Sequence, residues 1–342
     1  MSRGRPSRAT VYSRLETSVA ELRERFGGLP SPKESESIWA DIWHQEAHHS
    51  TALEGNTLVL REVESLLDQG RAVGAKPLKE YMEVKGYADA AQWVYGQALS
   101  PDGWSGEGLI SLNELRRIHY MAMTPVWDVA PHEHATAEEG PGSFRRHDIA
   151  PFPEGMTPPP WPEVHAHATS WIDDVRSVGA AMKSDQKSST PLPEGLAALH
   201  NRFERVHPFL DGNGRAGRLA LNLILVRLGH PPVIILKRQR EAYLHSMRKA
   251  DAGDYGPLGE LIARAMLDNL NRFIVPSIAG TARLVPLAAL ASKEFTVAAL
   301  RQAAQRGRLD AVQGPDGIWL SSQNSVQQYK RTKHTRRPKA SD

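Results

Sequence analysis

The sequence predicts a mainly α-helical protein. Apolar residues recur every three to four positions over long stretches, which is the period of a helix with one buried face. Breaks rich in glycine and proline, such as GGLPSP and GAKP, separate these stretches. Patterns typical of strands are confined to a weak alternation over residues 143–149 and a pair of short runs over residues 311–320. No segment of about 20–50 residues repeats, which excludes a solenoid.

Composition favours a cytoplasmic protein without membrane contact. The chain has 342 residues, which suggests more than one folded unit, and no apolar run approaches the roughly 20 residues that cross a bilayer. The basic first ten residues lack the apolar stretch of a secretory signal. Because the chain has no cysteine, disulfides, cysteine-ligated zinc and thiol catalysis are excluded.

Helices are expected along most of the first half of the chain. We expect residues 1–110 to form an N-terminal helical region, with an irregular stretch rich in Gly, Pro and His over residues 131–162. The individual helices are predicted over residues 16–26, 35–57, 59–69, 78–99, 111–124 and 161–175.

Two strongly apolar helices enclose a short polar loop. The first is predicted over Glu194–Val206 and ends before Pro208, because a residue that precedes proline disfavours the helical conformation. The second is predicted to start near Arg215, to be apolar on most sides and to end at Gly229. The loop between them reads HPFLDGNG.

This loop carries the pattern of an anion-binding site. Gly212 and Gly214 permit backbone angles that aim amide groups inward at a helix N-terminus, which suits phosphate. Arg215 and Arg218 are three residues apart, so both lie over the same end of the second helix. Arginines at a helix start oppose the helix dipole, which indicates that an anion is expected there.

The remaining polar residues of the loop add chemistry to the anion site. His207 is the group here that can accept a proton near neutral pH. Asp211 stands just before the glycines, where it can hold Mg²⁺ bridging two phosphates. Phe209 is expected to point into the core and anchor the loop. A base, a metal ligand, an anion site and two cations within twelve residues predict phosphate-ester transfer.

Other known motifs fit less well. Residues 212–217 match G-x-G-x-x-G, but a dinucleotide fold needs a strand before this motif, and a helix is predicted there. No P-loop motif is present. His44 and His48 share a helix face, yet Glu46 is one position late for a zinc-protease motif, so we interpret this face as solvated.

The segment HPFLDGNGRAGR resembles the complete signature of the Fic-domain family, H-P-F-x-[DE]-G-N-G-R-x-x-R. The resemblance is strongest over residues 197–218 and extends more loosely over residues 111–276, which we expect to form an all-helical Fic domain. It implies an enzyme that binds ATP with Mg²⁺ and transfers AMP to a Ser, Thr or Tyr hydroxyl of a protein, itself included. The roles implied are His207 as the base, Asp211 as the metal ligand, and Gly212, Asn213, Gly214, Arg215 and Arg218 as nucleotide-binding residues.

Two more segments resemble parts of this family. GPGSFRRHDI followed by TPPPWPEV is similar to the flap, a short β-hairpin that docks the target beside the site. STALEGN, which starts at Ser50, is similar to the inhibitory motif [ST]-x-x-x-E-[GN], here on a helix of about residues 37–56. By this resemblance Glu54 pairs with Arg218 and occupies the place of the γ-phosphate. By itself, Glu54-Gly55-Asn56 is also an ordinary helix end.

The C-terminal part has a different pattern. Two short helices, two strands around a Pro-Asp-Gly turn and a last helix resemble a winged helix-turn-helix module over residues 281–330. Thr296 is the expected N-cap of the second helix, and Ser321 or Ser322 of the last. The tail over residues 331–342 is strongly basic and expected to be disordered. Possible DNA contacts are Arg301, Arg306 and Arg308.

The functional prediction is an auto-inhibited protein adenylyltransferase. One alternative is a DNA-binding regulator whose helical core senses a nucleotide, although such a sensor has no need of His207. Another is a transferase that uses UTP or a CDP- or NAD-type donor, because nothing in the loop reads the base. Removal of AMP by the same site, docking of a protein on the C-terminal module, and a homodimer stay open.

Overall fold

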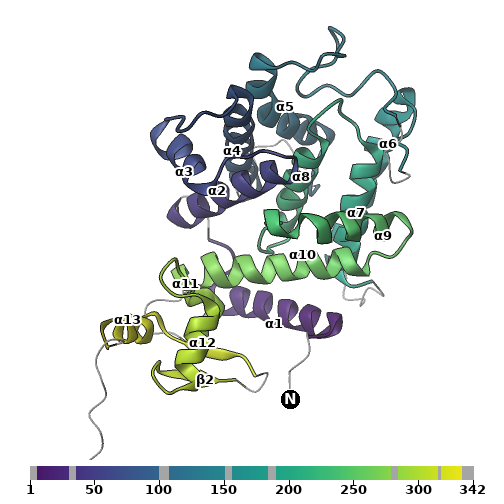
Figure 1. Cartoon of the computed structure of the whole chain (residues 1–342). Coiled ribbons are helices and arrows are strands. Elements are labelled where there is room, and N and C mark those ends of the chain that lie inside the picture. Colours follow the sequence, from purple (N-terminus) through teal and green to yellow (C-terminus); the bar gives the residue numbers. More distant parts are fainter. Residues whose placement is uncertain are drawn as a thin grey trace, which may run out of the picture. The chain divides into compact units, whose positions relative to one another are not determined.

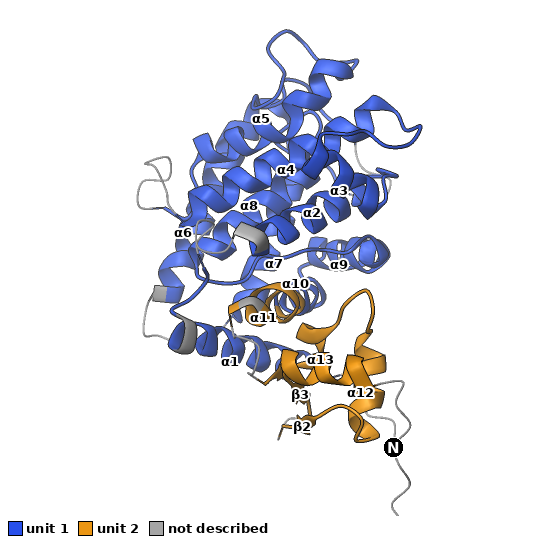
Figure 2. Cartoon of the chain, turned by 90° about the vertical axis from the view of Figure 1, so that its left-hand side faces the viewer, with its two compact units in different colours: residues 1–266 blue, residues 267–342 orange. Residues whose placement is uncertain are grey.

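A computed structural model describes residues 6–30, 36–99, 108–150, 156–183, 190–278, 284–314 and 317–332. The chain divides into two compact units, residues 1–266 and 267–342 (Figure 2). The helices predicted in the first 230 residues are present, and the described residues contain no helix that is long and apolar enough to cross a bilayer.

The first unit is helical. Its α-helices are α1 (Arg8–Phe26), α2 (Glu36–Leu53), α3 (Leu60–Gln69), α4 (Leu78–Leu99), α5 (Leu112–Val129), α6 (Val164–Lys183), α7 (Leu192–Val206), α8 (Asn213–Arg227), α9 (Arg240–Asp251) and α10 (Gly256–Asn269), with 3₁₀ turns η1 (Trp161–Glu163) and η2 (Lys237–Gln239). The last residues of α10 already belong to the second unit.

Helix α8 is the centre of this unit (Figure 1). It contacts α2, α4, α5 and α7, and every residue from Arg215 to Val226 is buried. Helices α4 and α5 lie in close contact at Gly86, where an added Cβ atom would lie 2.3 Å from the Ala122 carbonyl oxygen. The close packing around α8 therefore keeps the start of this helix, which carries Arg215 and Arg218, in a fixed position.

Helix boundaries differ from the sequence prediction at two important places. Helix α8 begins at Asn213, two residues before the predicted start near Arg215. Helix α2 ends at Leu53, so Glu54 lies in the turn that follows, with its N–H donating to the Thr51 carbonyl at 3.0 Å. The predicted helix had extended to about residue 56.

The predicted β-hairpin flap is not formed in the described residues of 143–164; its tip, residues 151–155, lies outside them. The backbone N–H groups of the first arm bond elsewhere: Arg145 donates to the Pro208 carbonyl at 2.9 Å and Arg146 to the Glu139 carboxylate. The second arm begins with three consecutive prolines, residues 158–160, which have no N–H to donate to a ladder.

The second unit is a small mixed module. Its elements are the π-helical turn η3 (Leu270–Ile274), α11 (Val275–Ile278), β1 (Val285–Pro286), η4 (Leu287–Leu290), α12 (Val297–Gln305), β2 (Ala311–Gln313), β3 (Trp319–Ser321) and α13 (Gln323–Thr332). The strands form an antiparallel sheet in the order β1-β3-β2. Leu287, Leu290, Phe295, Leu300 and Leu309 lie in its buried core.

Several local predictions for this module are confirmed. The Thr296 hydroxyl accepts from the Ala299 N–H at 3.2 Å and caps α12, and the Ser322 hydroxyl accepts from the Ser325 N–H at 3.1 Å before α13. The predicted helix over residues 285–294 was wrong, because Val285 and Pro286 pair with β3 and only the short turn η4 follows. The Pro-Asp of the predicted turn and the basic tail beyond residue 332 lie outside the described residues.

Candidate active site

The signature loop joins α7 to α8 and starts at an unusual backbone conformation. His207 ends α7 with φ of 47°, and it is the one non-glycine residue with positive φ in the described part of the chain. Its N–H donates to the Phe203 carbonyl at 3.1 Å. Its ring Nδ1 lies 3.3 Å from the Glu204 carbonyl, which favours a proton on Nδ1 and basic character on Nε2.

His207 is chemically suited to accept a proton. Burial lowers its pKa to about 4, and the nearby Arg145 guanidinium acts in the same direction. The imidazole is therefore neutral throughout the physiological pH range. A neutral imidazole beside an anion site is able to deprotonate a hydroxyl group.

The loop is braced from inside by Asn213 and Phe209. The Asn213 side chain accepts from the Phe209 N–H at 2.9 Å and donates to the Phe209 carbonyl at 2.7 Å. Phe209 is fully buried and stacks on the His119 ring with 3.7 Å between centroids and 4° between planes. The side chain of Asn213 is thus occupied within the loop, and only its backbone remains to serve an anion.

His119 was not singled out in the sequence, although it fixes the loop from helix α5. Its Nδ1 accepts from the Gly142 N–H at 2.8 Å, so its Nε2 carries the proton and donates to the Asp211 carbonyl at 2.8 Å. Burial lowers the pKa of His119 to about 4, which keeps this neutral form. No local sequence signal indicates this role, because it depends on the packing of α5 against the loop.

The glycines and arginines of the loop meet at the first turn of α8. Gly212 adopts a left-handed conformation with φ of 79° immediately before the helix. Arg215 and Arg218 are both buried at this turn. Arg215 contacts Asp211 at 3.2 Å and Glu83 at 3.8 Å. Helix N-terminal amides and two cations therefore share one small region, as an anion site requires.

Asp211 stays ionised in this environment. Burial alone would raise the pKa of its carboxyl group, but Arg215 and the N–H of Gly212 together bring that pKa below its usual value. The carboxylate is more than a third exposed, so part of it faces solvent at the edge of the anion site. A single ionised carboxylate beside a phosphate site is a donor set that Mg²⁺ accepts, with nucleotide phosphates and water as its other ligands.

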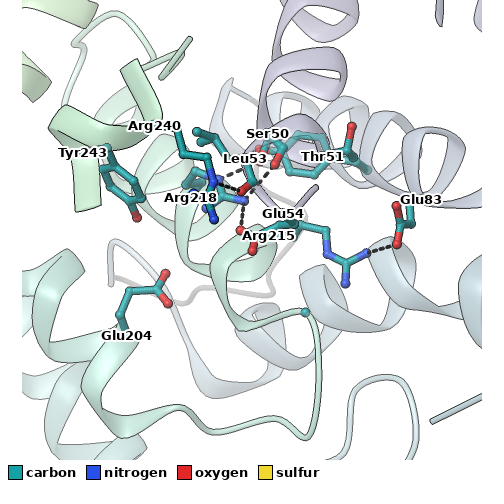
Figure 3. A network of polar contacts seen from close by, with 12 residues as sticks. Ser50, Thr51, Leu53, Glu54, Glu83, Glu204, Arg215, Arg218, Arg240 and Tyr243 are labelled. Carbon is teal, nitrogen blue, oxygen red and sulfur yellow. Dashed lines mark hydrogen bonds and ion pairs between the residues drawn. The ribbon is translucent and has the colours of Figure 1, made fainter. Parts of the chain in front are cut away.

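Arg218 is held by residues from the end of helix α2 (Figure 3). Its Nε donates to the Ser50 hydroxyl at 2.7 Å, and its Nη2 donates to the Ser50 carbonyl at 3.1 Å and to Glu54 Oε1 at 2.6 Å. Burial by itself would raise the pKa of Glu54, but the charge of Arg218 lowers it overall. The Glu54–Arg218 contact is thus an ion pair through a single carboxylate oxygen.

The helix that supplies Ser50 and Glu54 is anchored by a second carboxyl group. Glu46 is fully buried and accepts hydrogen bonds from the Tyr87 hydroxyl at 2.8 Å, the Tyr95 hydroxyl at 2.5 Å and the Asn222 amide at 2.8 Å. Burial raises its pKa.

In the sequence, Glu46 was considered only as a misplaced residue of a zinc-protease motif. The described residues contain no cluster of three or more metal-ligating side chains, so the zinc reading gains no support.

Arg145 joins the two arms of the expected flap to the signature loop. Its side chain is buried, with Nε donating to the His207 carbonyl at 2.8 Å, Nη1 to the His147 carbonyl at 3.0 Å and Nη2 to the Pro159 carbonyl at 2.6 Å. Reading the sequence alone missed this residue, because one arginine in a polar stretch is more often exposed.

The second unit carries the three arginines that were expected to contact DNA. Arg301 is on α12, and Arg306 and Arg308 follow it; all three are exposed. The guanidinium of Arg308 lies 5.9 Å from the centre of the Tyr329 ring.

A helical domain that presents two buried arginines, a helix N-terminus and a neutral imidazole defines a site for phosphate-ester chemistry. Residues 109–225 match the model of the Fic/DOC family. The chain is 29% identical over 261 residues to the protein adenylyltransferase Fic of Drosophila yakuba, and equally to that of Drosophila melanogaster; each alignment covers 75% of this chain and 46% of the relative. The chain therefore spans about half the length of these curated relatives.

Solved structures give the same family. A structure of a Fic-1 fragment from C. elegans superposes with a TM-score of 0.61 at 25% identity, covering 78% of this chain and 72% of that one. A Fic-domain signalling protein from Bacteroides thetaiotaomicron has a TM-score of 0.57 at 22% identity and covers 84% and 98%. At that lower identity the second likeness supports the fold alone.

Proposed function

We propose that the protein is an adenylyltransferase that moves AMP from ATP to a hydroxyl group of a protein and is held inactive by Glu54. The observation that carries the proposal is the placement of a neutral His207 on the loop that leads directly into the start of α8, where Arg215 and Arg218 are buried. The names of the relatives support the same activity.

Each residue of the loop and of the start of α8 has a separate role in the proposed reaction. The amides of residues 212–214 and the guanidinium of Arg215 hold the α- and β-phosphates, and Arg218 holds the γ-phosphate. His207 accepts the proton of the target hydroxyl as its oxygen attacks the α-phosphorus, and pyrophosphate leaves. Asp211 would hold Mg²⁺, which supplies charge neutralisation on the phosphates.

Glu54 blocks this arrangement by occupying Arg218. With Arg218 bonded to Ser50 and Glu54, the guanidinium does not serve a γ-phosphate. A triphosphate that still binds has to shift its phosphate chain, and a small shift away from in-line geometry costs orders of magnitude in rate. We therefore assign to Glu54 the role of the inhibitory residue.

Intact-protein mass spectrometry tests the proposal after incubation with MgATP. We expect an AMP-mass adduct on the Glu54→Gly variant, little on the wild type and none on the Glu54→Gly/His207→Ala double variant. Glu133→Gly is the matched control, since it removes an exposed loop glutamate far along the chain from this motif. Equal labelling of all four proteins, or none on any, would overturn the proposal.

The same assay tests the nucleotide donor. No described contact identifies a base-reading residue, so the choice of ATP rests on the similarity to Fic adenylyltransferases. Parallel incubations with UTP, a CDP-linked compound and NAD distinguish the donors by the adduct mass. An adduct with one of these and not with ATP would replace AMP transfer by transfer of another group.

For the second unit, we propose a winged-helix-like module over residues 281–330 that binds DNA. The order of η4, α12 and the β2–β3 hairpin, with exposed Arg301 and Arg306 at α12, supports this assignment. Fluorescence anisotropy with duplex DNA tests it: affinity should fall steeply with salt and weaken in an Arg301→Ala/Arg306→Ala variant. Salt-independent binding, or none, would favour a protein partner.

A further inference from the structure

Glu204 is a second acid beside the inhibitory ion pair, and the mechanism above leaves it unused. It lies on α7, three residues before His207, and its side chain is 14% exposed. Figure 3 shows its carboxyl group directed toward the Arg218–Glu54 pair from the side opposite Ser50. A Cβ atom added to Gly217 would lie 2.5 Å from Glu204 Oε1, so this carboxyl group rests against the first turn of α8.

This carboxyl group is poorly compensated in the structure. Its Oε1 is buried without a hydrogen-bond partner among the described residues. The nearest cationic candidate, His200 Nε2, is 4.0 Å away and is instead 2.7 Å from the Tyr243 hydroxyl. An ionised carboxylate in such a place is costly, whereas a protonated carboxyl group is not.

The charges around Glu204 leave it as the group that titrates near neutrality. Burial raises its pKa to about 7; Arg218 lowers that pKa and Glu54 raises it. Burial lowers the pKa of His200 to about 3, and burial raises the pKa of Tyr243, so both stay neutral. Burial alone would lower the pKa of Arg218, but Glu54 raises it and the guanidinium stays charged.

A γ-phosphate on Arg218 brings new negative charge to this place. The ion pair already puts Glu54 Oε1 within 2.6 Å of Arg218, and a terminal phosphate that replaces Glu54 carries more charge than a carboxylate. Two like charges that lie near one guanidinium in a buried site favour the neutral form of the weaker acid. Glu204 is that acid.

We propose that Glu204 couples ATP binding to a proton: its carboxyl group has to be protonated when a triphosphate occupies Arg218, which makes Glu204 a determinant of affinity for the γ-phosphate. The proposal rests on the proposed function of the site. It predicts that the affinity for MgATP weakens as the pH rises above neutrality. It also predicts that nucleotides without a γ-phosphate show a weaker pH dependence.

Isothermal titration calorimetry measures this coupling directly. The reference protein is Glu54→Gly/His207→Ala, which removes the inhibitory carboxylate, the base and turnover together. Between pH 6 and pH 8 its affinity for MgATP should fall about tenfold more than that of the same protein with Glu204→Gln, because Glu204 that is ionised at pH 8 has to take up a proton when MgATP binds. Glu133→Gln in the reference protein is the control and should leave the pH dependence unchanged.

The number of protons taken up when MgATP binds distinguishes a role of Glu204 in binding from a loss of structure in the variant. At pH 8, titrations in buffers of different ionisation enthalpy should show uptake of close to one proton more per MgATP in the reference protein than in its Glu204→Gln variant. Equal uptake with intact binding would overturn the role of Glu204 and leave the proposed function standing. Failure of MgATP to bind to either protein would overturn the proposed function itself.

Discussion

The Nε atom of Arg240 donates a hydrogen bond of 2.9 Å to the carbonyl oxygen of Leu53. Leu53 is the last residue of α2, and the next residue is Glu54. Carbonyl groups at a helix C-terminus lack partners within the helix and carry partial negative charge, so a guanidinium satisfies both needs. Helix α9 thereby fixes the point from which the Glu54 carboxylate extends toward Arg218.

Loss of this bond should weaken inhibition. We expect Arg240→Ala to raise AMP transfer severalfold above the wild type and to stay below Glu54→Gly, because Ser50 still holds Arg218. The measurement is the initial rate of labelling with radioactive ATP. Arg238→Ala, an exposed arginine two residues away, should behave like the wild type. A wild-type rate for Arg240→Ala would show that α2 holds its end without α9.

The buried carboxyl group of Glu46 should contribute strongly to stability. Glu46→Ala leaves Tyr87, Tyr95 and Asn222 without a shared partner and opens a cavity, which should cost about 2–4 kcal/mol in the free energy of unfolding. Glu46→Gln keeps the shape and should cost less than half as much. Urea denaturation followed by circular dichroism gives both values. Equal losses for the two variants would mean that the hydrogen bonds to the carboxyl group matter here and the packing of the side chain does not.

Gly212 is needed for two separate reasons, which a paired experiment distinguishes. A Cβ atom at this position would lie 2.6 Å from the Met123 sulfur, and its φ of 79° disfavours any other residue. Gly212→Ala should therefore lower stability by about 1–3 kcal/mol. Gly70 has φ of 64°, and no atom lies within 4 Å of a Cβ added there. Gly70→Ala should therefore lose stability only through the unfavourable backbone conformation. Thermal melting that shifted equally for both would exclude crowding by Met123.

Acid should destabilise the protein through its buried histidines. Burial lowers the pKa of His230 to about 4, whereas an unfolded histidine has a pKa near 6.5. Between these values the unfolded chain binds more protons, so stability falls as the pH drops from 6.5 to 4. For His230 alone the loss is about 2–3 kcal/mol. His230→Leu should show a smaller loss between pH 7 and pH 4.5 in urea denaturation; an identical loss would assign the effect to other groups.

Sequence reasoning was successful where the physics is local. The helical period, the serine and threonine caps and the uninterrupted loop motif each depend on neighbours within a few residues, and the structure has the corresponding helices and the Thr296 cap. The short strand at Val285–Pro286 exists only because β3, more than thirty residues later, offers partners for it. The predicted flap failed for the opposite reason, since its polar backbone groups found partners outside a hairpin.

The supporting residues of the site were beyond local patterns. Glu46, His119 and Arg145 act through contacts with elements far away in the chain, and nothing in their immediate neighbours marks them. A buried charged or polar side chain is exceptional, and its partners are visible only after the helices are packed. The loop motif predicts where the chemistry takes place, and the packing shows which residues hold the loop in position.

The left-handed backbone at His207 has a consequence for protein engineering. In this left-handed conformation, any residue other than glycine lowers the stability of the folded state by about 1 kcal/mol. A mutant library screened for heat resistance alone would therefore enrich glycine at position 207. The most heat-resistant variants would then lack the imidazole that we propose as the base, so selection for stability and selection for activity would favour different residues at position 207.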